Sequence, residues 1–240
     1  MFKLKRNTLH NQAIEALLGM IKEGYFIDNR LPSEEELAGM MGISRGTLRE
    51  ALHSLVNTGV ITKKQGRGNF YHRDIAALSG RLDLTTDFIE ILESQGGVVR
   101  VEQSQPVKTA ASAGARAKLH LGPEDEVWSF DWLYYKNEQP AILAEIEVPH
   151  KYFLSPAWQQ KPSRTLKEYY ELHCASELAK MVIWMKSRTY SRAAGIFQKD
   201  FSAPLTWWEE VWYTLEDNPA CYVNVYFKPG LVELAMVVNL

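Results

Sequence analysis

A short segment near the N-terminus concentrates hydrogen-bond donors at the start of an expected helix. Ser44, Arg45, Thr47 and Arg49 supply two hydroxyl groups and two guanidinium groups. An arginine can contact a guanine edge through two hydrogen bonds, whereas hydroxyls and the backbone amides at a helix start suit phosphates. On an isolated helix the same arginines would form a solvated surface, so the DNA-contact interpretation depends on the neighbouring elements.

Those neighbouring elements follow a helix-turn-helix order. Residues 9–23 repeat apolar side chains at spacings of three and four, which predicts a first helix. Ser33 followed by Glu36 has the pattern of a capping box and predicts the start of a second helix. Gly42 interrupts that helix, and Ser44 is the predicted N-cap of a third. The hydroxyl and guanidinium donors that begin at Ser44 therefore lie at the start of the second helix of a helix-turn-helix.

A basic hairpin is expected directly after the third helix. Residues 59–71 read as two short strands joined by a glycine-rich turn that follows Lys63 and Lys64. Gly66 and Gly68 allow the backbone to approach a duplex closely, and the arginine between them could enter a minor groove. A hairpin that needs glycines only for turning is the alternative. The predicted DNA contacts are Ser33, Ser44, Arg45, Thr47, Arg49, Lys63, Lys64, Gln65, Gly66, Arg67 and Gly68.

Length and charge favour two modules. The chain has 240 residues, enough for two domains of ordinary size. Its net charge is −2, but residues 1–75 hold 11 Lys and Arg against 8 Asp and Glu, while the remainder holds 16 against 21. A weakly basic DNA reader joined to an acidic module fits site-specific binding better than indiscriminate coating of DNA. We expect a DNA-binding domain at 1–75, a linker at 76–100 and a second domain at 101–240.

The second half is rich in strand-forming segments. An α+β domain with a mainly antiparallel sheet is expected, because turn residues at 136–139 and 216–219 separate neighbouring strands. The expected strands are Val98 to Val101, Val127 to Tyr135, Ala141 to Val148, Ala179 to Tyr190, Leu205 to Leu215 and Ala220 to Phe227. Helices are expected near Phe88 to Leu92, Ala110 to Leu119, Leu166 to Leu172 and Arg192 to Phe197.

Several classes of protein are disfavoured. Cys174 and Cys221 are too few and too isolated for a disulfide framework or a thiolate metal site. The chain shows no signal peptide and no run of about 18 apolar residues, which favours a cytoplasmic location. The six histidines lack metal-ligand spacing, and no nucleophile elbow or phosphate loop occurs. We expect no enzyme activity, no cofactor and no metal.

The N-terminal motifs resemble a known family. Leu31-Pro32-Ser33-Glu34, Gly42-Ile43-Ser44-Arg45, Thr47-Leu48-Arg49 and Gln65-Gly66-Arg67-Gly68-Asn69-Phe70 are similar to the winged helix-turn-helix of GntR regulators. The resemblance implies a homodimeric transcription regulator, usually a repressor, with a ligand-sensing C-terminal domain. The family usually has an arginine where this chain has Glu35, and a carboxylate there would repel phosphate or accept from a cytosine amino group.

The second half more faintly resembles the UTRA effector-binding domain of the HutC subfamily, which has a chorismate-lyase-like fold. Residues 132–149 and 217–227 carry this likeness, and the strand patterns disfavour the all-helical domain of the FadR subfamily. Counted from Pro140, Trp132 and Tyr134 stand where many relatives have effector-binding arginines. Cys221 stands where an acidic residue is common, and Glu145 keeps the usual type. The predicted effector contacts are Trp132, Tyr134, Glu145, Cys221 and Tyr222.

Replacing cations by aromatic rings disfavours an anionic effector such as a sugar phosphate. A hydrophobic, aromatic or cationic ligand becomes more plausible, and rings with a carboxylate could form a cage for an ammonium group. The alternative places these rings in the core and at a dimer interface. The residues considered for the cage are Trp132, Tyr134, Trp184, Trp207, Trp208, Trp212 and Glu145.

Double-stranded operator DNA and a small-molecule effector are thus the expected partners. Each recognition helix of a dimer would occupy one half-site of a near-palindromic operator. Two other functions stay open at this point. One is an enzyme of chorismate-lyase-like fold with an accessory DNA-binding domain, and the other is a non-specific architectural DNA binder.

Overall fold

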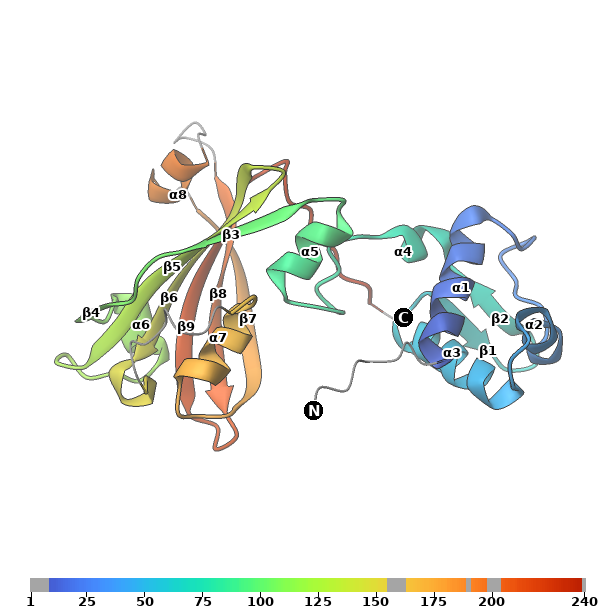
Figure 1. Ribbon diagram of the computed structural model, residues 1–240, viewed down its shortest axis with the longest axis horizontal. Coiled ribbons are helices and arrows are strands. Elements are labelled where there is room, and N and C mark those ends of the chain that lie inside the picture. The colour runs from blue at the N-terminus through green and yellow to red at the C-terminus, as the bar shows by residue number, and fades with distance from the viewer. Residues whose placement is uncertain (1–8, 155–162, 189–190, 198–203, 239–240) are drawn as a thin grey trace. The chain divides into compact units, whose positions relative to one another are not determined.

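The computed structural model describes residues 9–154, 163–188, 191–197 and 204–238. These residues divide into two compact units, one of residues up to 85 joined by residues from 234 onward, the other of residues 86–233. Figure 1 labels the elements of each unit. In the ranges described, no helix combines the length and apolar character needed to cross a bilayer.

The first unit is a winged helix-turn-helix. Its helices are α1 (Leu9–Glu23), α2 (Glu34–Met41), α3 (Arg45–Asn57) and the short α4 (Arg73–Ala77). Strands β1 (Ile61–Lys64) and β2 (Gly68–Tyr71) pair antiparallel, with Lys64 opposite Gly68. Leu17, Leu48 and Ile61 are fully buried and join the helices and the hairpin in one core. The predicted order of helices and hairpin is confirmed.

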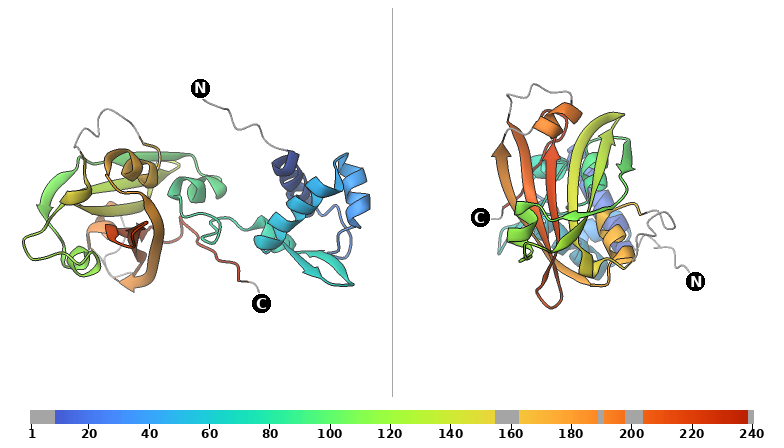
Figure 2. Two further views of the ribbon diagram at one scale, coloured as in Figure 1. Left: turned by 90° about the horizontal axis from the view of Figure 1, so that it is seen from below. Right: turned by 90° about the vertical axis from the view of Figure 1, so that its left-hand side faces the viewer.

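The second unit is built on an antiparallel sheet, whose strands lie side by side in Figure 2 (right). Its strand order is β3-β5-β6-β9-β8-β7, and β4 pairs with β5 on the same side as β3. The strands are β3 (Val99–Gln103), β4 (Val107–Ala110), β5 (Glu126–Lys136), β6 (Gln139–Pro149), β7 (Leu178–Arg188), β8 (Leu205–Thr214) and β9 (Pro219–Phe227). The helices are α5 (Phe88–Ser94), α6 (Ala113–Lys118), α7 (Leu166–His173) and α8 (Ser191–Ile196), with a 3₁₀ turn η1 (His150–Tyr152).

Helices cover both faces of this sheet. On one face, the Phe88 ring of α5 lies 5.2 Å from Tyr134 and 6.0 Å from Trp208, and Tyr169 of α7 lies 5.7 Å from Trp132. On the other face, residues of α6 form an apolar cluster with Tyr222. Residues of α8 form a second apolar cluster with the sheet. Because side chains alternate along a strand, neighbours such as Tyr222 and Val223 belong to opposite faces.

Two boundaries differ from the sequence-based expectation. Helix α5 packs on the sheet, so the second unit begins at Thr86 and the linker expected at 76–100 is largely part of that unit. Residues near the C-terminus join the first unit, where Leu82 donates its backbone N–H to Ala235 and Ala235 donates to Gly80.

The helix expected from Ala110 starts at Ala113, after the unexpected strand β4. Residues 189–190 of one expected strand lie outside the described residues.

Candidate nucleic-acid interface and ligand cavity

The turn between α2 and α3 is held by local backbone chemistry. Ser33 forms the expected capping box, accepting from the backbone of Glu36 at 3.2 Å and donating its own N–H to that carboxylate at 2.9 Å. Gly42 ends α2 with a left-handed φ of 63°, which a side chain would disfavour. Ser44 then caps α3 by accepting from the N–H of Thr47 at 3.1 Å. These caps fix the direction in which α3 leaves the turn.

The polar face of α3 carries the two predicted arginines. Leu48 and Leu52 face the core of the unit, whereas the side chains of Arg45 and Arg49 are 55% and 67% exposed. The hydroxyls of Ser44 and Thr47 lie 2.9 Å apart at the start of the same helix. The arrangement leaves both guanidinium groups on the solvent side, where a duplex could meet them.

Both arginines are paired with glutamates of α2, a feature that the sequence analysis missed. Glu35, which stands where GntR regulators usually have an arginine, forms an ion pair with Arg45. Glu34 accepts from Nε of Arg49 at 2.5 Å and lies 3.6 Å from Nζ of Lys63. The hydrogen bond from Arg49 lowers the pKa of Glu34 below its ordinary value. In sequence, these glutamates look only like favourable charges at a helix start.

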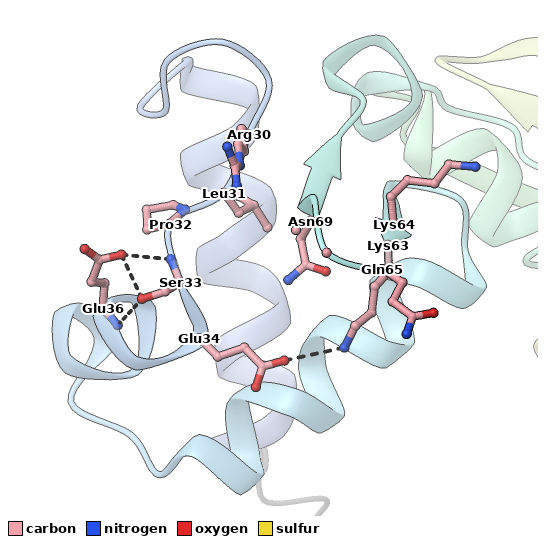
Figure 3. A pocket seen from close by; sticks show the side chains of 12 residues that line it. Arg30, Leu31, Pro32, Ser33, Glu34, Glu36, Lys63, Lys64, Gln65 and Asn69 are labelled. Carbon is pink, nitrogen blue, oxygen red and sulfur yellow. Dashed lines mark hydrogen bonds and ion pairs between the residues drawn. The ribbon is translucent and has the colours of Figure 1, made fainter.

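The hairpin and the start of α2 enclose a groove, shown in Figure 3. Gly66 and Gly68 adopt positive φ values of 71° and 99° at the tip. Arg30, which the sequence analysis did not select, lies 3.4 Å from where a Cβ of Gly68 would stand. The guanidinium of Arg67 lies 5.7 Å from the Phe70 ring centre. Predicted contacts that line the groove are Ser33, Lys63, Lys64, Gln65, Gly66 and Gly68.

The second unit contains a cavity of about 600 Å³ on the sheet face that packs against α6 and α8. Its floor comes from β5, β6, β8 and β9. The lining residues are Ser112, Ala113, Gly114, Ser129, Asp131, Glu145, Glu147, Arg192, Trp207, Glu209, Tyr222, Asn224 and Tyr226. A volume of this size suits a small organic ligand.

Charged groups dominate the cavity. Arg192 forms ion pairs with both Asp131 and Glu145. Glu209 pairs with Nζ of Lys186 at 2.5 Å and accepts from the Tyr222 hydroxyl at 3.0 Å. Burial raises the pKa of Glu209, but these two hydrogen bonds together with the positive charges of Lys186 and Lys118 outweigh burial and hold it below its ordinary value. The carboxylate of Glu209 is therefore ionised at neutral pH.

Of the five predicted effector residues, two line this cavity and three do not. Glu145 and Tyr222 line the cavity. Trp132, Tyr134 and Cys221 are at most 2% exposed and lie on the opposite face of the sheet, so the structure does not bring them into this cavity. Counting from a proline fixes a position along a strand, but it does not show which face that position takes.

The aromatic cage is not assembled either. Trp207 lines the cavity, but Trp208 and Trp212 donate their indole N–H groups to Glu210 on the opposite face. Trp184 lies under Nζ of Lys118, which is 3.5 Å from its ring centre. Within the described ranges, no group of three or more His, Cys, Asp and Glu residues could hold a metal ion.

Comparisons with known proteins agree with this architecture. The model of the bacterial regulatory proteins of the gntR family matches residues 9–70, and the UTRA domain model matches residues 94–230. The mannosyl-D-glycerate transport/metabolism system repressor MngR of Escherichia coli (strain K12) is 27% identical over 165 residues, which are 69% of this chain and 64% of that protein. The HTH-type transcriptional repressor NagR of Bacillus subtilis (strain 168) is 39% identical over 37% of this chain and 36% of that protein. The matches thus span less than two thirds of these relatives.

Solved structures share the fold at low sequence identity. The possible transcriptional regulator YydK from Bacillus subtilis subsp. subtilis str. 168 superposes with a TM-score of 0.70 at 15% identity, covering 97% of this chain and 100% of that chain. PhnF from Mycobacterium smegmatis gives a TM-score of 0.56 at 17% identity, covering 94% and 99%. With both domain models matched in the order observed, this chain belongs to the GntR family of bacterial regulatory proteins and carries a UTRA domain.

Proposed function

We propose that this chain is a sequence-specific DNA-binding transcription regulator, acting as a repressor, and not an enzyme. The observation that carries the proposal is the solvent-facing pair Arg45 and Arg49 on α3, beside the basic hairpin. A helix of this kind enters the major groove, where arginines read guanine edges. The lysines and Arg67 of the hairpin add phosphate and minor-groove contacts. MngR and NagR are both named as repressors, which supports the same function.

The regulator acts as a homodimer on an operator of near two-fold symmetry. One winged helix-turn-helix reads only a short half-site, and a closed two-fold dimer doubles the number of base contacts without a second gene product. The operator of this chain differs from those of relatives with arginine at position 35. Glu35 withholds Arg45 and adds a negative charge next to the recognition helix.

The UTRA cavity is the effector site in this proposal. A ligand in the cavity controls operator binding only if it has different affinities for the DNA-competent and DNA-incompetent states. Operator and effector must then weaken or strengthen each other by the same factor. The presence of a cavity in a domain separate from the DNA reader supports this division of labour.

The proposal is tested by selecting binding sequences from random double-stranded DNA with the purified full-length chain at near-physiological salt. Recovery of a two-fold symmetric motif is the expected result. The Arg49→Ala variant, treated in parallel, should enrich a weaker motif with relaxed preference at one position of each half-site. Equal retention of all sequences by the parent chain would contradict sequence-specific binding and favour an architectural role.

A further inference from the structure

The cavity floor contains a row of polar side chains that crosses four adjacent strands. Asp131 of β5 pairs in register with Glu145 of β6, Glu145 pairs with Asn224 of β9, and Asn224 pairs with Glu209 of β8. Like charges directly opposite each other on neighbouring strands repel and destabilise a sheet unless a cation lies between them. Asp131 and Glu145 are such a pair, so this position on the floor demands a positive charge.

In the structure, a side chain of the protein itself meets that demand. The guanidinium of Arg192, which comes from α8, bridges the two carboxylates with one nitrogen on each. The side chain of Arg192 is 48% exposed, whereas those of Asp131 and Glu145 are 28% and 18% exposed. The cation is thus the accessible member of the cluster, and the carboxylates are the fixed and more buried members.

Two donors at the cavity are already engaged by carboxylates. The backbone N–H of Ser112, at the start of α6, donates to Glu147 at 2.8 Å. Lys186, beside the cavity, pairs with Glu209. Four of the described lining residues are carboxylates, and they face two cations, Arg192 in the lining and Lys186 beside it, which leaves a formal excess of two negative charges. An anionic group entering here would meet like charges in a partly desolvated space.

An apolar aromatic wall borders the acidic row. The rings of Trp207 and Tyr226 stack 5.8 Å apart with an interplanar angle of 13°, and both line the cavity. The two side chains are only 5% and 0% exposed, so they close that side of the cavity and favour an apolar part of a ligand beside them. The neutral groups of Ser129 and Asn224 add hydrogen-bonding capacity on the same floor.

We propose that this cavity takes a cationic ligand, an amine or guanidine of amino-sugar or amino-acid size, whose positive group replaces Arg192 between Asp131 and Glu145. The inference rests on the proposed role of the UTRA domain as the effector site. In the structure, Arg192 ties α8 to β5 and β6. A cationic ligand takes over the two carboxylates and releases that tie. The two states therefore differ in what holds α8 against the sheet, which is the differential contact that a switch requires.

Binding is measured by titration calorimetry on the full-length chain with size-matched probes of different charge. One set is glucosamine, glucose and glucose 6-phosphate, and a second is n-butylamine and 1-butanol. We expect the cationic member of at least one set to bind most tightly, with an affinity that falls as salt rises. Preference for glucose 6-phosphate, or cations that bind no better than their neutral counterparts, would overturn the proposal.

Two sets of variants locate the cation. Asp131→Asn combined with Glu145→Gln should weaken binding of the cationic probe by at least about thirtyfold, because its partners lose their charge. Arg192→Gln should instead tighten binding by about tenfold, because it removes the internal competitor. The control is Arg164→Gln, which removes an exposed arginine–glutamate pair elsewhere in the unit. Weaker cation binding by Arg192→Gln would contradict replacement and indicate that Arg192 supports the site instead of competing with the ligand for it.

Operator binding is measured separately with the same probes. If a cationic probe binds in the cavity but leaves operator affinity unchanged, the ligand class stands and the effector role fails. If glucose 6-phosphate both binds and changes operator affinity, the effector role stands and the cationic ligand class is wrong.

Discussion

Glu210 makes the stability of the UTRA domain depend on pH in a direction unusual for a glutamate. Its side chain lies on the sheet face opposite the cavity and is 2% exposed. The two carboxylate oxygens accept from the indole nitrogens of Trp208 at 2.7 Å and Trp212 at 2.9 Å. Burial raises the pKa of Glu210 to about 7, although both hydrogen bonds act to lower it. Between pH 4.5 and about 7, Glu210 therefore keeps its proton in the folded domain and releases it in the unfolded chain.

The size and the sign of the effect on the free energy of unfolding follow from that pKa shift. A rise from 4.5 to about 7 corresponds to about 3 kcal/mol of unfolding free energy, at about 1.4 kcal/mol per unit. This contribution is complete below pH 4.5, declines as pH rises towards the folded pKa, and is lost above about 7. Glu210→Gln removes the titration. The oxygen of the glutamine amide still accepts from one indole N–H, but the amide NH₂ group faces the N–H of the other indole. The two facing donors lower the free energy of unfolding by about 1 to 2 kcal/mol at pH 5.

The assay is urea unfolding followed by tryptophan fluorescence between pH 5 and 8.5. All seven tryptophans belong to residues 86–233, so the signal reports this unit alone. The variant should be less stable than the parent at pH 5 and should match or exceed it at pH 8.5. The adjacent Glu209→Gln is the contrasting control: the pKa of Glu209 lies below its ordinary value of 4.5, so its contribution to stability stays constant across this pH range and is lost only at lower pH. If the parent and Glu210→Gln lost stability in parallel across this range, burial of Glu210 would not be the cause.

Three further predictions concern the DNA-binding unit. Arg45→Ala should cost about 1 to 3 kcal/mol in operator binding and relax base preference at one position, measured by fluorescence anisotropy on operator variants; an unchanged preference would exclude Arg45 from base reading. Glu35→Gln should leave the unfolding free energy within about 0.5 kcal/mol, since the pair is exposed, yet strengthen operator binding and steepen its salt dependence by about one unit; an unaltered slope would contradict the competition between Glu35 and DNA for Arg45. Gly42→Ala should destabilise the first unit by about 1 kcal/mol because its φ is 63°, whereas Gly39→Ala, in the interior of α2, should not; hydrogen exchange of α3 amides measures both.

The DNA-binding unit could be predicted closely because its signals are local. Ser33 and Ser44 cap the helices they were expected to cap, and Gly42 supplies the left-handed residue between them. Hydrophobic periodicity within each helix identified the core face. The sequence could not show which side chains meet across the turn. Glu34 pairs with Arg49 and Glu35 pairs with Arg45, and both pairs depend on how α2 crosses α3.

The cavity was predicted poorly because it is assembled from distant strands. Strand segments were recognised from their composition, but the face of each residue depends on registry across β5, β6, β9 and β8. Trp132 and Tyr134 were therefore expected to contact the effector, whereas the structure places both in the buried core. Arg192 carried no signal in sequence, since its partners lie 61 and 47 residues earlier in the chain.

Recognition of a specific operator by α3 and the hairpin is measured as a specificity ratio. The affinity of the full-length chain for its selected sequence is compared with that for a scrambled duplex of equal length, at one stated salt concentration. We predict that the selected sequence binds at least about 1,000-fold more tightly. Equal affinities for the two duplexes, with the same salt dependence, would contradict the account and leave only non-specific attraction to phosphates.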